Sequence, residues 1–543
     1  MRWIAPTEKD SATVTLEKRL WDAADQLRAN SGLTAAQYAT PILGLIFLRF
    51  AEASFNARRG ELKAIPTSAR RGSRVEEPAE YHASGVLYLE REAQFEYLLT
   101  LPQGADIGAK VNAAMRSVER TNPKLAGVLP KTYNVFSNDL LKDLLKKMSE
   151  IPVTIDYDVF GRIYEYFLAE FAMTQGQGGG EFYTPSPIVR LLVEIIEPYK
   201  GKILDPACGS GGMFVQSANF VSAHHGRPAS DLSIYGIEKV DATGALCRMN
   251  LAIHGLEGDI RHGGQTNSYY DDPFKATGTF DFVLANPPFN VDGVNKERLV
   301  GEVGPQRKYP FGLPKADNAN YIWISMFYSA LNERGRAGFV MASGAEGGST
   351  SAAAPEIRKS LVEADAVDVM IAVGTNMFYT VPLPCTLWFL DRAKPSSKRA
   401  GKTLFIDVRG IYRQIDKAHR DWTDAQLAVI ANIVRLHRGE QVDLAIGGGE
   451  VSAKLKELFG DKPVYTDIPG LCKAATRAEI EAQGWSLNPG RYVGVAPTEE
   501  ISDEDFKVQM QRLNAELQDL NEQARVFERA IARNFAVIVE SPR

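Results

Sequence analysis

The stretch Lys-Ile-Leu-Asp-Pro-Ala-Cys-Gly-Ser-Gly-Gly at residues 202–212 decides the fold class. Residues 202–205 read as a short strand, and the glycines after it form a turn before an apolar helical stretch. Glycine accepts positive φ and lets a ligand approach the backbone closely. The dinucleotide spacing G-x-G-x-x-G is absent, because residue 214 is Phe, and so is the phosphate-loop Gly-Lys-Ser/Thr. We therefore expect Asp205 to face the amino-acid end of a ligand.

Outward from this stretch, short β-rich runs alternate with helical stretches. Further strands are expected at residues 233–238, 280–285, 337–342, 367–373 and 385–390. This alternation predicts an α/β fold with a doubly wound, Rossmann-like and largely parallel sheet over residues 151–410. Ligands of such sheets lie at the carboxyl ends of the strands.

The regions on either side of this core read as mostly helical. Residues 1–150 are expected to form a helical N-terminal domain, with helices over 15–56 and 92–150. Between these helices, the arginines of a polar loop at 57–88 are either solvated or touch a phosphate backbone. Residues 411–500 are expected to form a mostly helical extension, with a break at Gly447–Gly449 and an ordered turn at Trp485–Tyr492.

The last segment, residues 501–543, is expected to be one long helix. Its apolar residues recur with spacings of four and three, at Phe506, Met510, Leu513, Leu517, Leu520, Ala524, Phe527 and Ile531. The stripe either packs on the chain's own domain or joins another chain in subunit assembly.

Composition excludes several classes of protein. The 543 residues carry a formal net charge of −5, which argues against holding nucleic acid alone through a large basic surface. Four separated cysteines without a CxxC pair indicate neither a disulfide framework nor a zinc site, and favour the cytoplasm. The longest apolar run, Ile42–Leu48, is too short for a membrane span.

Two further motifs follow the next strands in order. Glu238 ends a strand, where an acid either accepts hydrogen bonds from both hydroxyls of a ribose or is a surface residue. Asn286-Pro287-Pro288-Phe289 follows the strand at 280–285. Prolines fix the backbone and leave its carbonyls exposed, so this turn can grip an amino group while Phe289 stacks on a planar base. A proline-rich turn with a core Phe is the alternative.

A glycine-rich segment precedes the core. Gly178-Gly179-Gly180-Glu181-Phe182-Tyr183-Thr184-Pro185 lies just before a helix expected to begin near Pro187, which Thr184 or Ser186 can cap. It is either a segment that folds over a ligand or a plain linker.

Together and in this order, these motifs resemble the gamma class of N6-adenine DNA methyltransferases. Nearly the whole chain is similar to the modification subunit of type I restriction-modification systems. The resemblance implies S-adenosylmethionine as methyl donor, no metal, and a target adenine flipped out of the duplex. It implies a cofactor site made of Glu181, Phe182, Tyr183, Thr184, Pro185, Ser186, Asp205, Ala207, Gly209, Ser210, Gly211, Gly212 and Glu238. It implies a catalytic turn made of Asn286, Pro287, Pro288 and Phe289.

The resemblance also implies partners: double-stranded DNA, a specificity subunit shared by two modification subunits, and in some systems a restriction subunit, with no membrane. DNA binding by the chain alone is expected to be weak and salt-sensitive, with a local basic lining that includes Arg298, Arg307 and Lys308 of a mobile loop at 290–320. The stretch Gly263–Asn267 departs from the acidic or Asn-containing turn of many relatives, so its contact to the adenine ring stays unassigned.

Two alternatives of other classes stay open. The first is a protein-glutamine N5-methyltransferase, whose Asn-Pro-Pro turn would hold an amide nitrogen, although such enzymes are small and usually have Tyr where Phe289 stands. The second is a non-catalytic, cofactor-binding assembly subunit. A cytosine-type nucleophile at Pro384-Cys385 is disfavoured, because Cys385 opens an apolar strand and is expected to be a core residue.

Overall fold

The computed structural model describes most of the chain between its two ends. The described residues are 1–5, 21, 25, 32–33, 35–64, 74–102, 104–151, 163–171, 184–315, 317–347, 355–378, 383–416, 419–495 and scattered positions from 510 to 525. The chain divides into a unit of residues 1–493 and a unit of residues 494–543. The predicted tail helix falls almost entirely outside the described residues, and so does the first predicted helix, before residue 35.

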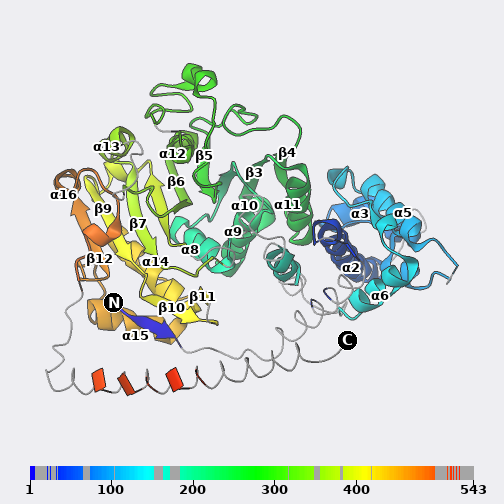
Figure 1. The fold of residues 1–543 in the computed structure, drawn as a ribbon. Helices are drawn as coiled ribbons and strands as arrows, with labels where there is room; N and C mark the ends of the chain where they lie inside the picture. Colours follow the sequence, from blue (N-terminus) through cyan, green and yellow to red (C-terminus); the bar gives the residue numbers. More distant parts are fainter. Residues whose placement is uncertain are drawn as a thin grey trace, which may run out of the picture. The chain divides into compact units, whose positions relative to one another are not determined.

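A nine-stranded mixed sheet forms the centre of the first unit (Figure 1). Its strand order is β12-β9-β7-β8-β6-β5-β2-β3-β4. The strands are β2 (Gly201–Asp205), β3 (Leu232–Glu238), β4 (Gly258–His262), β5 (Phe280–Ala285), β6 (Leu331–Ala342), β7 (Val367–Val373), β8 (Cys385–Asp391), β9 (Lys402–Asp407) and β12 (Cys472–Thr476). The neighbours from β4 to β6 are parallel, whereas β8 runs antiparallel to both β6 and β7.

The predicted α/β fold with a doubly wound sheet is confirmed, and the six predicted strands are present. Three strands of the sheet, β4, β9 and β12, were not predicted. In the edge strand β4 only Ile260 is buried, so no apolar run marks that strand in the sequence. Strand β9 does contain a buried apolar run, Leu404, Phe405 and Ile406, which the strand prediction missed.

Helices cover both faces of the sheet, because its strand residues alternate between two apolar cores. On one face pack α8 (Ser186–Ile196), α9 (Gly212–Ala223), α14 (Asp424–Arg438) and α15 (Gly448–Phe459). On the other pack α12 (Asn320–Ala330), α13 (Pro355–Glu363) and α16 (Arg477–Ala482). Neighbouring residues show the alternation: Ile203 of β2 belongs to the first core and Leu204 to the second.

The N-terminal region has a helical core of its own. Its helices are α2 (Ala35–Ala64), α3 (Pro78–His82), α4 (Phe95–Leu99), α5 (Ile107–Thr121) and α6 (Asn138–Ser149). From the sheet region, α11 (Asp241–Ile253) contributes Met249 and Ile253 to this core, and the short α10 (Pro228–Asp231) lies between α9 and β3.

The expectation of a loop over residues 57–88 is wrong in two places. Helix α2 continues to Ala64, and α3 lies within the second half of the range. The physical reason is pairing: Arg58 donates to the Glu80 carbonyl and to Glu61, and Arg59 lies 3.6 Å from a Glu76 carboxylate oxygen. These arginines therefore hold the polar end of α2 on the segment around α3.

The C-terminal extension contains strands as well as helices. The chain's first strand, β1 (Trp3–Ala5), pairs in parallel with β10 (Ile411–Gln414), which pairs with β11 (Arg420–Asp421). The break predicted at Gly447–Gly449 is confirmed at Gly447, which has positive φ and is the N-cap of α15, whereas Gly448 and Gly449 are the first two residues of that helix. The turn predicted at Trp485–Tyr492 is ordered, with the Tyr492 ring stacked on Phe405 at 4.0 Å between centroids.

Within the described residues, no helix has both the length and the apolar composition of a membrane span, and no cluster of side chains suits a metal ion. The cysteines at 208, 247, 385 and 472 are free thiols, all buried. Cys385 opens β8 and is 3% exposed, and burial raises the pKa of its thiol, so the prediction of a core cysteine is confirmed.

Candidate functional site

The glycine-rich turn lies at the carboxyl end of β2, as its sequence predicts. Asp205 is 1% exposed, and its Oδ1 accepts a hydrogen bond of 3.0 Å from the Ala207 N–H. The Cys208 N–H donates to the Ile237 carbonyl at 3.0 Å, which ties the turn to β3. Burial raises the pKa of the Asp205 carboxyl to about 8, although the Ala207 N–H lowers it, and the Glu238 charge adds to the rise.

Two glycines of the turn adopt conformations that other residues rarely adopt. Gly209 has φ +52° and Gly211 has φ +85°. A Cβ on Gly211 would lie 2.8 Å from the Cys247 sulfur of α11, whereas a Cβ on Gly209 or Gly212 would meet no atom within 4 Å. The turn is therefore packed against α11 at Gly211 and open at Gly209 and Gly212.

Glu238 joins the turn to the end of β3. Its Oε2 accepts the Gly209 N–H at 3.0 Å, and its Oε1 accepts the Val240 N–H at 2.8 Å. The Gly263 N–H donates to the Glu238 backbone carbonyl at 3.1 Å. The stretch Gly263–Asn267 after β4 thus begins beside Glu238, next to the site.

The Asn-Pro-Pro-Phe turn follows β5, the strand beside β2. The register pairs Leu204 with Val283, so the ends of both strands lie at the same edge of the sheet. The Asn286 amide Nδ2 donates a 2.7 Å hydrogen bond to the Thr184 hydroxyl oxygen. Its Oδ1 is buried and has no hydrogen-bond partner in the described part of the chain. Pro287 is buried, and Phe289 is half-buried against the α8 face of the sheet.

The backbone beyond Phe289 is held by asparagines. Asn290 has φ +54°, a left-handed conformation that Asn tolerates better than most residues. Its N–H donates to Asn320 Oδ1 and its own Oδ1 accepts from Asn320 Nδ2, both at 2.9 Å. The first residue of α12 therefore fixes the exit of the turn.

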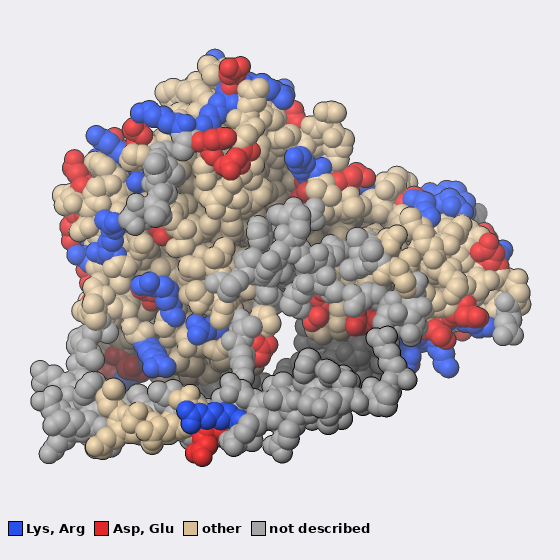
Figure 2. All heavy atoms as spheres, in the orientation of Figure 1, with Lys and Arg blue, Asp and Glu red and all other residues tan. Residues whose placement is uncertain are grey.

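The cations of the loop at 290–320 are engaged by the chain itself. Lys308 is 8% exposed, and its ammonium donates to the Ser268 carbonyl at 2.6 Å and the Asp271 carbonyl at 2.7 Å. The prediction that Lys308 belongs to a basic lining is thus wrong, because its ammonium is buried and two of its three N–H groups donate to backbone carbonyls. Arg298 stacks on the Tyr270 ring at 3.9 Å, and Arg307 donates to the Gly301 carbonyl. On the face drawn in Figure 2, Lys and Arg are interspersed with Asp and Glu.

The structure brings most of the predicted site residues to one edge of the sheet. Those at the ends of β2, β3 and β5 and at the start of α8 are Asp205, Ala207, Gly209, Ser210, Gly211, Gly212, Glu238, Asn286, Pro287, Pro288, Phe289, Thr184, Pro185 and Ser186. Glu181, Phe182 and Tyr183 lie outside the described residues. The expected cap of the next helix is wrong: α8 begins at Ser186, and its N-cap is Pro185, which has no side-chain oxygen. The Thr184 hydroxyl accepts a hydrogen bond from Asn286.

Sequence reasoning missed two asparagines that support the site. Asn320 is one, and Asn250 of α11 is the other: it is 1% exposed, and its Nδ2 donates to the Ser210 carbonyl at 2.9 Å. Asn250 could have been found from the sequence, because it lies within the apolar stretch of α11 and a buried amide needs a hydrogen-bond partner.

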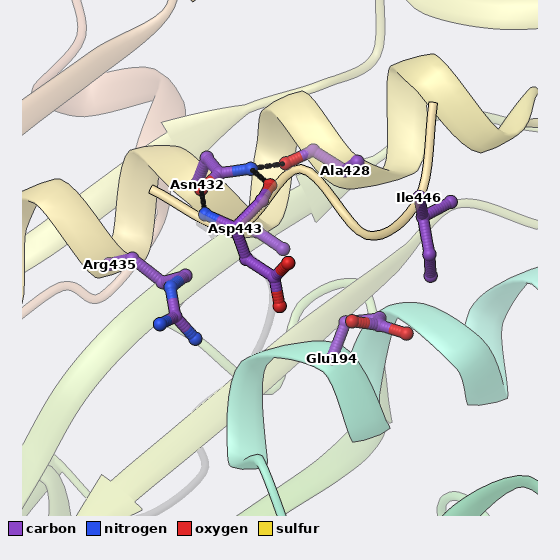
Figure 3. A pocket seen from close by; sticks show the side chains of 7 residues that line it. Glu194, Ala428, Asn432, Arg435, Asp443 and Ile446 are labelled. Atoms are coloured by element: carbon purple, nitrogen blue, oxygen red, sulfur yellow. Dashed lines mark hydrogen bonds between the residues drawn. The ribbon is translucent and has the colours of Figure 1, made fainter. Parts of the chain in front are cut away.

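A separate small pocket lies between α8, α14 and the segment after it (Figure 3). Its lining includes Glu194, Arg435 and Asp443, and Glu194 lies eight residues, or about 12 Å, along α8 from Ser186. In Figure 3 the Glu194 carboxylate projects from α8 toward Asp443 and Ile446. None of the residues that line this pocket belongs to the glycine-rich turn.

Glu194 is expected to make stability depend on pH. Burial raises the pKa of its carboxyl to about 7, while His224 nearby lowers it. The folded state therefore binds a proton that the unfolded state releases between about pH 4.5 and 7, so stability falls as pH rises through this window. At pH 8, Glu194→Gln is expected to raise the free energy of unfolding by about 1–2 kcal/mol relative to wild type, whereas at pH 5 it should change this free energy little.

Urea unfolding at both pH values measures this gain, with Glu481→Gln on the exposed side of α16 as the control. Equal effects of Glu194→Gln at pH 5 and pH 8 would contradict the expectation.

Comparisons with known proteins agree with this geometry. The family model described as N-6 DNA methylase matches residues 155–501, and that of the HsdM N-terminal domain matches residues 16–148. The type I restriction enzyme MjaIX methylase subunit of Methanocaldococcus jannaschii is 36% identical, over 94% of this chain and 88% of its own length. The HindI methylase subunit of Haemophilus influenzae is 33% identical, over 80% of this chain and 94% of its own length.

A solved structure supports the fold. The methyltransferase subunit of a type I restriction-modification system from Streptococcus thermophilus superposes with a TM-score of 0.67 at 21% identity, over 89% of this chain and all of that chain. The sheet, its flanking helices and the helical N-terminal region are thus a known arrangement. The chain belongs to the N-6 DNA methylase family, among the methylase subunits of type I restriction enzymes.

Proposed function

We propose that this chain transfers a methyl group from S-adenosylmethionine to N6 of an adenine in DNA, as the modification subunit of a type I restriction-modification complex. The observation that carries the proposal is the buried Asn286 Oδ1 without a hydrogen-bond partner in the described part of the chain, placed beside the glycine-rich turn. A buried acceptor without a donor costs about 1–3 kcal/mol, and an exocyclic amine supplies that donor.

The residues at the end of β2 and β3 fit the cofactor. The turn is open at Gly209 and Gly212, at the N-terminus of α9, where a carboxylate is favoured. Asp205 at the end of β2 suits an ammonium group, and the Glu238 carboxylate, fixed by two backbone N–H groups, suits ribose hydroxyls. We assign Thr184–Ser186, Asp205, Ala207, Gly209–Gly212 and Glu238 to this site, together with Glu181–Tyr183 from outside the described residues.

When bound, S-adenosylmethionine supplies a methyl group activated by a sulfonium. The residues of this chain orient the target amine and its lone pair. Asn286 Oδ1 and the Pro287 carbonyl accept its two hydrogens, which favours a pyramidal nitrogen with a directed lone pair. Phe289 stacks on the flipped base. Positioning and electrostatics of this kind need neither a metal nor a covalent enzyme intermediate.

Reconstitution tests the proposal. The chain is mixed with its specificity subunit, cognate duplex DNA and methyl-labelled S-adenosylmethionine, and the DNA is digested to nucleosides. We expect the label on N6 of adenine. Label on cytosine, on a protein glutamine, or on neither DNA nor protein would refute it.

The partners in this proposal are double-stranded DNA and one specificity subunit shared by two modification subunits. The likeness to methylase subunits of type I enzymes over nearly the full chain supports the subunit role. Light scattering of the purified complex measures the ratio, and a 1:1 complex would contradict it.

Cofactor affinity is expected to depend on the ionisation of Asp205. With a pKa of about 8 in the free protein, this carboxyl is protonated at pH 6, whereas a bound ammonium favours the charged form. Binding must then release a proton, so affinity should rise about tenfold per unit from pH 5.5 to 7. Calorimetry in two buffers of different ionisation enthalpy counts this proton.

The variant Asp205→Asn serves as control, because its affinity should be low and nearly constant over this range. A wild-type affinity that stays constant from pH 5.5 to 7 would show that Asp205 does not ionise on binding.

A further inference from the structure

We propose that Thr184 is a positioning residue for the methyl transfer reaction, and that its hydroxyl holds the amide of Asn286 in place. The inference rests on the proposed function and goes beyond the cofactor contact assigned to Thr184. It starts from a single hydrogen bond of 2.7 Å between side chains 102 residues apart in the sequence.

The backbone on both sides of this hydrogen bond is firmly placed. Asn286 follows β5, which lies in the sheet between β2 and β6, and buried Pro287 comes next. Thr184 precedes Pro185, and a residue before proline is restricted to extended backbone. Pro185 is buried, and its carbonyl accepts the first backbone bonds of α8, a helix packed against α9 and α14.

The Thr184 hydroxyl is available for this purpose because it does not cap α8. Helix starts usually recruit a Ser or Thr hydroxyl, but here Pro185 occupies the N-cap position and no side-chain bond caps the helix. The hydroxyl oxygen receives the Nδ2 hydrogen of Asn286 instead. A β-branched side chain has few χ1 choices, which keeps that oxygen in one place.

The consequence concerns the other end of the amide. With its Cβ set by the strand and its Nδ2 held by Thr184, the planar Asn286 side chain has one polar atom left, the buried Oδ1. The plane of the amide then sets the direction of that acceptor. Misplacement of a reacting group by about 1 Å can cost about 10²-fold in rate, so loss of this anchor is expected to lower kcat, separately from any effect on the cofactor contact assigned to Thr184.

The test compares Thr184→Val, which keeps the shape but removes the hydroxyl, with Thr184→Ser, which keeps the hydroxyl. Single-turnover methylation is measured in the complex with specificity subunit and DNA at saturating S-adenosylmethionine, and the Kd of the cofactor is measured separately. At saturating cofactor, where a weaker Kd no longer affects the rate, we expect Thr184→Val to slow the reaction by about 10- to 100-fold, and Thr184→Ser, which keeps the hydroxyl, to recover most of that rate.

A double-mutant cycle sharpens the result. If Thr184 acts through Asn286, adding Thr184→Val to Asn286→Ala causes no further loss. Thr403→Val is the matched control: Thr403 is 2% exposed in β9, its hydroxyl donates to the Val367 carbonyl, and its loss is expected to leave the rate unchanged.

Two results would overturn the inference: a weaker cofactor Kd with an unchanged rate in Thr184→Val, or a full additional loss in the double variant. Both differ from failure of the proposed function, in which the wild-type complex itself would place no label on adenine N6.

Discussion

Replacing Asn286 with alanine is expected to slow methyl transfer by about 10²–10³-fold, the cost of losing one preorganised hydrogen-bonding group at a reacting centre. The variant removes the buried Oδ1 that we propose as the acceptor for the amine, and it also removes the Nδ2 that Thr184 holds. The glycine-rich turn and Glu238 are untouched, because their hydrogen bonds run between β2, β3 and α11. Cofactor affinity should therefore stay near that of wild type.

Single-turnover labelling of DNA measures the rate, and calorimetry measures cofactor binding. Asn332→Ala is a matched control, since Asn332 Nδ2 donates to Asp281 Oδ1 at 2.8 Å near the opposite end of β5. It should methylate at the wild-type rate. A wild-type rate in Asn286→Ala would instead restore the idea of a non-catalytic assembly subunit.

Replacing Asp368 with alanine is expected to destabilise the protein by about 3–5 kcal/mol, because it leaves buried arginines without their shared partner. Asp368 is fully buried at the start of β7, ion-paired with Arg399 and 3.1 Å from the Arg438 guanidinium. Burial alone would raise the pKa of Asp368, but Arg438 and Arg399 outweigh burial and hold its pKa well below the usual range. Arg438 also donates to the Ile195 carbonyl at the end of α8, so the destabilisation is expected to extend to α8, the helix that follows Thr184.

Urea unfolding monitored by circular dichroism measures this loss. Glu363→Ala removes an exposed pair with Lys359 on α13 and should change stability by no more than about 0.5 kcal/mol. A loss of that small size in Asp368→Ala would mean that the arginines find other partners.

The motifs themselves were readable from the sequence. Strands with continuous apolar runs, such as β7 and β8, are buried on both faces and are recognised by composition alone. The glycine-rich turn, Glu238 and the Asn-Pro-Pro-Phe turn each follow a strand, so their shared edge follows from the rule for parallel sheets. Strand β4, with one buried residue, lacked such a signal, as did the antiparallel edge strand β12.

Side-chain partners were not readable, because they join residues that are far apart in the chain. Lys308 has the charge of a DNA contact, but its ammonium is bound to two backbone carbonyls. Thr184 has the residue type and position of a helix cap, but its hydroxyl bonds Asn286. The sequence by itself determined the fold class and predicted the chemistry of the site, since both depend on local patterns of residue type. Only the tertiary structure decided which donors each acceptor meets, because hydrogen bonds depend on distances that folding alone creates.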